Sequence, residues 1–184
     1  TPMVGLVDTA VIGRLGDAAL IGGVAIGSLI GDLVFTTCNF LRAGTTGLVA
    51  QADGRGDRTE VNAVLARAVV VALAAGLAIV AALPLLAGGA TRIFGGSAEV
   101  QAATTTYVWI RLLGAPLVLT NFAIFGWLLG LGRAGLGLTL QTVLNGINIA
   151  LAILFVLGFG WGETGAAWAA LLADAGALVA GLLV

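Results

Sequence analysis

The chain has 184 residues and a net charge of −1; 60% of its residues are hydrophobic and only 9% are charged. Soluble domains carry about 25% charged residues, so this composition excludes a soluble globular protein and indicates an integral membrane protein. The apolar runs are about 20 residues long, which suits membrane-spanning helices, whereas barrel strands are ~10 residues long with alternating polarity. No cluster of basic residues is present, and we therefore expect no nucleic-acid partner.

The residue types present also restrict the chemistry. The sequence has no histidine and a single cysteine, Cys38. The commonest general base and metal ligand is therefore missing, and an internal disulfide is excluded. We find no nucleophile paired with a base, so we expect no enzyme, no cofactor and no metal site.

Six helices joined by short turns are predicted, which gives an all-α, multi-pass protein of the cell (inner or plasma) membrane. The second helix is longer than a bilayer requires, so it should tilt or project beyond the lipid. The chain begins without methionine and ends inside an apolar run, and we expect a piece of a longer protein, cut at both ends. The predicted helices span residues 1–13, 18–51, 57–86, 106–130, 136–159 and 164–184.

Local signals predict where these helices begin, bend and end. Asp57 lies three residues before Glu60, a capping-box spacing that predicts a helix start. The glycine-rich residues 88–97 predict a turn, which a short amphipathic lead-in follows. Pro116 predicts a kink, because proline lacks the backbone N–H that an α-helix needs.

Arginines indicate the orientation in the membrane, because the chain has no lysine. Five arginines lie near the 53–57 hairpin and the 132–135 turn, and three lie on the opposite side. The positive-inside rule therefore favours the side with five as the cytoplasmic side. The five are Arg42, Arg55, Arg58, Arg67 and Arg133, and the three are Arg14, Arg92 and Arg111.

Glycines recur every four residues on two of the predicted helices, at Gly23, Gly27 and Gly31 and again at Gly126 and Gly130. Small residues at this spacing let helix backbones approach closely. Tight packing within the bundle is the interpretation that we favour. The alternative is that these glycines loosen helices that must bend.

Asp8 stands in the middle of a short apolar run from Val4 to Arg14. An acidic residue at the centre of a membrane helix costs about 2.5–3.5 kcal/mol on insertion scales, and it usually faces a partner, a cavity or a proton path. At about 1.5 Å per residue, Asp8, Asn148 and Asp174 lie roughly 13–16 Å from the same membrane surface, on three helices.

These groups predict a site that couples transport to a proton or a cation. A carboxylate in a poorly solvated place can hold a proton near neutral pH, whereas water entry or a bound cation favours its charged form. A proton and a cationic substrate then compete for one group, which is the logic of an antiporter. The predicted coupling residues are Asp8, Asp32, Asn145, Asn148 and Asp174, and the predicted substrate-cavity residues are Thr9, Thr36, Asn39 and Asn121.

Two stretches resemble a known family. Residues 7–16, VDTAVIGRLG, resemble the first helix of multidrug and toxic compound extrusion (MATE) transporters. Residues 40–52, FLRAGTTGLVAQA, resemble the inner end of the second helix in the DinF-like branch of that family. Looser similarities occur at Glu99, Tyr107, Pro116, Asn145 and Gly165.

The resemblance implies the N-terminal, six-helix lobe of a twelve-helix transporter with two lobes. Such a transporter exports organic, often cationic, small molecules in exchange for protons or sodium, by alternating access across the lipid bilayer. Residues 1–184 would form a single lobe, and the missing C-terminal lobe of the same protein would be its partner. The family's first-helix acid maps onto Asp8; where an acid is expected on the fifth helix the chain has Asn148, beside Asn145.

Three alternatives remain open. A lipid-linked oligosaccharide flippase of the same superfamily would need basic residues in its cavity, and Arg111 is the one arginine placed to reach inward. A membrane-embedded enzyme would use Asp8 and Asp174 as an aspartyl dyad. A passive structural subunit of a membrane complex predicts no change in any flux when Asp8 becomes Asn.

Overall fold

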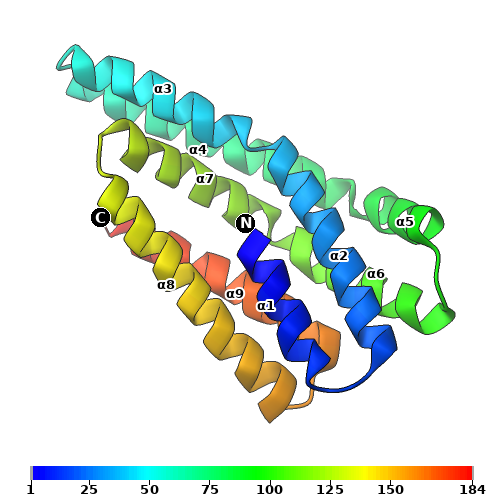
Figure 1. Ribbon diagram of the computed structural model, residues 1–184. Helices are drawn as coiled ribbons and strands as arrows, with labels where there is room; N and C mark the ends of the chain where they lie inside the picture. Colours follow the sequence, from blue (N-terminus) through cyan, green and yellow to red (C-terminus); the bar gives the residue numbers. More distant parts are fainter. Residues whose placement is uncertain (1, 184) are drawn as a thin grey trace.

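The structure is a computed structural model that describes the backbone of residues 2–183 and the side chains of residues 5–89 and 93–183. Every regular element in this part of the chain is a helix (Figure 1). The elements are α1 (Pro2–Gly13), α2 (Ala18–Thr37), α3 (Phe40–Gly54), α4 (Arg58–Ala81), α5 (Leu83–Phe94), α6 (Ala98–Leu113), α7 (Ala115–Gly130), α8 (Ala134–Ala152), the π-helical turn η1 (Ile153–Gly158) and α9 (Gly162–Leu182).

Four stretches of the described chain are long and apolar enough to cross a membrane, and the bent pair α6–α7 gives a fifth. Helix α1 has only 12 residues. The six predicted segments therefore correspond to α1, α2–α3, α4–α5, α6–α7, α8–η1 and α9, and the predicted all-α membrane fold is confirmed. The four long stretches are Ala18–Gly54, Arg58–Ala81, Ala134–Gly158 and Gly162–Leu182.

Acidic caps fix where two of these helices begin. Asp17 accepts hydrogen bonds from the backbone N–H groups of Ala19 and Leu20, at 2.9 and 3.2 Å. Asp57 accepts one from the backbone N–H of Glu60 at 2.9 Å, which confirms the predicted start. Such caps contribute about 0.5–2 kcal/mol each, and they place the polar turns at opposite ends of the lobe.

Two of the long predicted helices are interrupted. The second predicted helix is divided into α2 and α3 at Cys38–Asn39, although the two pieces together still form one apolar span. The third ends at Ala81, and a separate helix, α5, begins at Leu83. Figure 1 shows α2 and α3 following one another along the lobe, with the shorter α5 to the right of α2 in this view, where it packs against α6.

The prediction of a turn over residues 88–97 was wrong in its extent. Helix α5 continues to Phe94, and the connection to α6 is confined to residues 95–97, in which Gly95 and Gly96 have φ angles of 61° and 106°. The reason is packing: Leu83 and Ala87 are buried in a cluster with residues of α2 and α6. That burial outweighs the about 1 kcal/mol by which each glycine disfavours a helix.

The predicted kink at Pro116 is confirmed. Helices α6 and α7 meet at Gly114 with a bend of 49°. Pro116 lies in the first turn of α7, where its missing N–H cannot continue the hydrogen bonding of α6. Helix α4 packs directly on the bend, because a Cβ atom added to Gly76 would lie 2.5 Å from Pro116 Cα.

Glycines also bring α7 against α3. A Cβ atom on Gly126 would lie 2.5 Å from the carbonyl oxygen of Arg42, and one on Gly130 would lie 2.6 Å from Val49 Cβ. The Thr46 hydroxyl donates a hydrogen bond to the Gly126 carbonyl at 3.1 Å. The predicted role of this glycine pair in tight helix packing is therefore confirmed.

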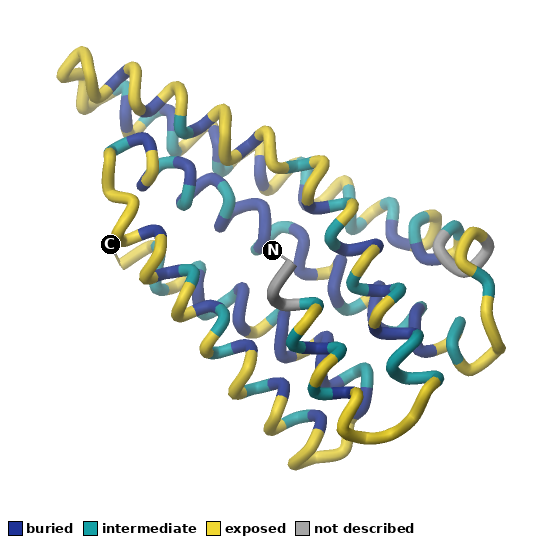
Figure 2. The backbone as a smooth tube through the Cα atoms, in the orientation of Figure 1, coloured by how far each residue is buried: buried dark blue, intermediate teal, exposed yellow. Residues whose placement is uncertain are grey.

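The outer faces of the helices are apolar and exposed, and the inner faces are buried (Figure 2). Leu33 is 67% exposed and Leu77 is 61% exposed, as expected for side chains that contact lipid. Arg111, in contrast, is only 6% exposed. It reaches inward, as the sequence predicted, and therefore does not count among the exposed arginines of the opposite side. The side chain of Arg92 lies outside the described residues.

Candidate functional site

The glycine stripe of α2 (Gly23, Gly27 and Gly31) packs against α6 and positions two polar side chains of that helix. A Cβ atom on Gly27 would lie 2.6 Å from Tyr107 Cδ1, and one on Gly31 would lie 3.4 Å from Arg111 Cγ. Tyr107 and Arg111 are four residues apart, so they share one face of α6. The close approach of α2 therefore holds both side chains in the interior, where Tyr107 is fully buried.

Asp8 lies at the centre of this interior and is fully buried. The Tyr107 hydroxyl donates a hydrogen bond of 2.6 Å to Asp8 Oδ2. Asn148 on α8 is 1% exposed and lies close enough to act on the Asp8 carboxylate. The structure thus brings together Asp8 and Asn148, two of the predicted coupling residues, from helices 140 positions apart in the sequence.

Three polar atoms of the Asp8 and Asn148 side chains have no hydrogen-bond partner among the described residues. They are Asp8 Oδ1, Asn148 Oδ1 and Asn148 Nδ2. Buried polar atoms are nearly always paired with protein groups or water. Two of the three are oxygens, one of them on a carboxylate. This arrangement suits a group that brings positive charge or donates a hydrogen bond, such as a proton on Asp8, a water molecule or a small cation.

A buried ion pair lies next to this group. Arg111 donates a hydrogen bond from its guanidinium to Asp174 Oδ2 at 2.8 Å, with side-chain exposures of 8% and 7%. The guanidinium carbon also lies 4.9 Å from the centre of the Phe35 ring. Asn121 donates from Nδ2 to the backbone carbonyl of Asp174 at 2.9 Å. These contacts join α6, α7 and α9 to α2.

The charges of Asp8, Arg111 and Asp174 act on one another electrostatically. Arg111 is the one buried cation among the described residues, whereas two carboxylates are buried there. When both carboxylates are ionised, the cluster carries one net negative charge. One added proton or monovalent cation would neutralise it.

A sequence model described as MatE matches residues 1–154, which is most of the chain. The chain belongs to the MatE family. The resemblance to MATE transporters that the motifs at 7–16 and 40–52 indicated is therefore confirmed.

Curated relatives agree with this assignment. The MatE chain is 38% identical over 183 residues to DNA damage-inducible protein F of Escherichia coli, covering 100% of the chain and 40% of that relative, which supports the DinF-like branch. It is 27% identical over 175 residues to the probable multidrug resistance protein NorM of Caulobacter vibrioides, covering 93% of the chain and 37% of the relative. The chain thus spans about two fifths of the length of these relatives.

Solved structures show the same fold. An inward-facing multidrug resistance MATE family transporter of the MOP superfamily matches with a TM-score of 0.89 and 23% identity, over 98% of this chain and 41% of that one. A MATE structure in a bent conformation matches with a TM-score of 0.87 and 23% identity, over 98% and 40%. This coverage fits one lobe of a larger transporter fold.

The remaining predicted residues of the MatE lobe lie elsewhere. Asp32 is half-buried and lines a pocket of about 400 Å³ with Thr9, between α1 and α2. Asn145 is half-buried and accepts a hydrogen bond from Gln141 at 3.3 Å, one turn from Asn148. Thr36 and Asn39 are exposed at the junction of α2 and α3, whereas Asn121 is 4% exposed and belongs to the packing around Asp174.

Two residues of this buried polar group were missed as partners of the acids. Tyr107 and Arg111 were noted in the sequence, but neither was assigned to Asp8 or Asp174. The signal that could have found them is register: Tyr107 and Arg111 have the same four-residue spacing as Gly27 and Gly31. Gly27 leaves room for Tyr107, and Gly31 leaves room for Arg111.

Proposed function

We propose that the protein containing this chain is a secondary active efflux transporter, which exchanges protons or sodium ions for organic small molecules. Residues 1–184 form one six-helix lobe in this proposal, and a second lobe completes the transport path. Family membership supports the general activity. The observation that carries the coupling role is the buried, incompletely paired group formed by Asp8 and Asn148.

The chemistry follows from competition for Asp8. In a closed, dry lobe a bound proton or cation neutralises the excess negative charge of Asp8, Arg111 and Asp174. When the lobe opens to water, the charged carboxylate is better solvated and releases its proton. An organic cation that binds near the ionised carboxylate would in turn oppose reprotonation, and this mutual weakening is what antiport requires.

The competing functions gain less support from the contacts of these residues. A flippase would use Arg111 to hold a pyrophosphate, yet the Arg111 guanidinium is already bound to Asp174. An aspartyl dyad would need Asp8 and Asp174 to share a proton, yet Asp8 is bound to Tyr107 and Asp174 to Arg111.

The test is transport by the full-length protein in sealed vesicles. Efflux of a fluorescent organic cation is driven by a pH gradient or, separately, by a sodium gradient, and wild type is compared with Asp8→Asn. Glu163→Gln, which removes an acid at the start of α9 away from the buried cluster, is the matched control.

We expect gradient-driven efflux that Asp8→Asn abolishes and Glu163→Gln retains. The gradient that drives efflux identifies the coupling ion. If Asp8→Asn transports as well as wild type, Asp8 is not the coupling residue. If the wild type moves no organic cation under either gradient, the proposed antiport is wrong.

A further inference from the structure

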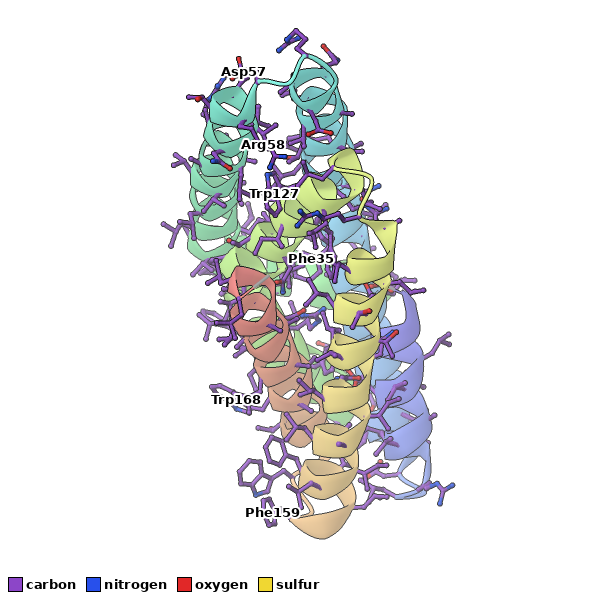
Figure 3. The ribbon with its side chains drawn as sticks, turned by 90° about the vertical axis from the view of Figure 1, so that its left-hand side faces the viewer. Phe35, Asp57, Arg58, Trp127, Phe159 and Trp168 are labelled. Atoms are coloured by element: carbon purple, nitrogen blue, oxygen red, sulfur yellow. The ribbon has the colours of Figure 1, made fainter. Side chains whose placement is uncertain are left out.

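A second polar site lies at the opposite end of the lobe from the α1–α2 turn. A pocket of about 330 Å³ opens between the α3–α4 hairpin and the α7–α8 turn. Its polar lining comes from Asp53, Arg58, Asn62, Trp127 and Arg133. Figure 3 shows Arg58 and Trp127 next to one another where α4 and α7 adjoin. No residue of this pocket belongs to the Asp8 cluster.

The two arginines of this pocket outnumber its one carboxylate. No ion pair joins Arg58 or Arg133 to a carboxylate among the described residues, although Asp53 lines the same pocket. On the same helix α4, Arg67 does form an ion pair with Glu60 at 2.8 Å. Two guanidinium groups and one carboxylate give the pocket a net charge of +1.

Further donors accompany the guanidinium groups. The Trp127 indole N–H is buried and has no hydrogen-bond partner in the described part of the chain. The Asn62 amide adds N–H donors at the same wall. Guanidinium and other N–H groups that converge on one pocket are suited to the oxygens of a phosphate group, and arginine binds such oxygens with two parallel hydrogen bonds.

The pocket lies at the ends of apolar helices, a position that suits contact with lipid headgroups. Arg58 is the first residue of α4, and Trp127 lies one turn from the end of α7 at Gly130. Tryptophan is enriched at the boundary between membrane and water, and this end carries the excess of arginines that marks the cytoplasmic side. Basic pockets between membrane helices on that side bind anionic lipid headgroups.

We propose that this pocket binds the phosphate of an anionic phospholipid from the cytoplasmic leaflet. Arg58 and Arg133 contact the oxygens of the lipid phosphodiester. The single negative charge of that phosphodiester balances the net charge of the pocket. Asp53 accepts a hydrogen bond from a hydroxyl group of the headgroup. The lipid then links the α3–α4 hairpin to the α7–α8 turn. This inference does not depend on the proposed transport activity.

The test measures lipid binding to the full-length protein by native mass spectrometry. The detergent-solubilised protein is titrated with phosphatidylglycerol, with phosphatidylcholine and with inorganic phosphate. The variants are Arg58→Gln and Arg133→Gln, and Arg55→Gln is the matched control because Arg55 lies in the same hairpin but does not line the pocket. Arg58→Lys keeps the charge and removes only the planar fork.

We expect phosphatidylglycerol to bind in preference to phosphatidylcholine. Each glutamine variant should weaken that binding about fivefold, because the binding free energy that one basic residue contributes near an anionic headgroup corresponds to about this factor in affinity. Arg58→Lys should weaken the binding less. Arg55→Gln should bind as wild type does. Equal weakening by Arg55→Gln would show general attraction to charge and overturn the site. Saturation by inorganic phosphate alone, or equal binding of both lipids, would also overturn it.

Discussion

The ion pair between Arg111 and Asp174 provides a prediction in which the two single variants differ. Arg111→Met leaves two buried carboxylates, Asp8 and Asp174, without the one buried cation of the described chain. Asp174→Asn leaves Arg111 with the charge of Asp8 nearby as a partial counter-charge. We therefore expect Arg111→Met to destabilise the protein more than Asp174→Asn does.

The magnitude follows from burial and geometry. The pair is joined at 2.8 Å, with side-chain exposures of 8% and 7%, so solvent screens it little. Removing one partner of such a pair costs about 3–5 kcal/mol, because the other charge stays buried without compensation. Replacing both partners is often close to neutral, so the double variant should recover more than half of the loss caused by Arg111→Met.

The assay is unfolding of the full-length protein in detergent, by heat or by added sodium dodecyl sulfate, followed through tryptophan fluorescence. A double-mutant cycle then gives the coupling free energy between Arg111 and Asp174. Simple addition of the two single losses in the double variant would show that Arg111 and Asp174 are not coupled. A larger loss for Asp174→Asn than for Arg111→Met would show that Arg111 does not neutralise both carboxylates.

Three further changes test other parts of the account. Gly27→Ala places a Cβ atom 2.6 Å from the Tyr107 ring and should lower unfolding stability by about 1–3 kcal/mol, whereas Gly47→Ala, with no atom within 4 Å, should be neutral or stabilising in the same assay. Tyr107→Phe removes the 2.6 Å donor to Asp8 and should cost about 1–3 kcal/mol; unchanged unfolding would contradict that bond. Asp57→Ala removes the cap of α4 and should cost about 0.5–2 kcal/mol, with faster hydrogen exchange confined to the first turn of α4.

Composition and apolar periodicity were enough to predict the membrane class and the order of the helices. Those signals are local, because a run of apolar residues and a polar turn are read within about 20 residues. Where local signals conflicted with packing, packing decided the outcome. The glycines of α5 are helical because Leu83 and Ala87 are buried against other helices, and no pattern within residues 88–97 contains that information.

The candidate site was predicted by residue type but not by partner. Asp8, Asn148 and Asp174 were selected because a polar group inside a membrane is costly and usually faces a partner or a cavity. All three are buried in the interior. Their hydrogen-bond partners depend on how each helix is rotated about its axis. A helix that is apolar on every side, such as α7, carries little periodic signal to fix that rotation, so long-range pairs could not be assigned.

The glycine stripe of α2 fixes the rotation of α6 about its axis. Packing thereby determines which charged side chains face the interior. Small residues let helix backbones approach closely, and the space beside Gly27 and Gly31 is filled by Tyr107 and Arg111. Once Tyr107 is set by that contact, its hydroxyl reaches Asp8, and Arg111, one turn further along α6, reaches Asp174. The same glycines that allow tight packing therefore determine which charges meet inside the lobe. A change at Gly27 should consequently alter the Asp8 environment as well as stability, whereas a change at Gly126 on α7, packed against α3, should alter stability alone.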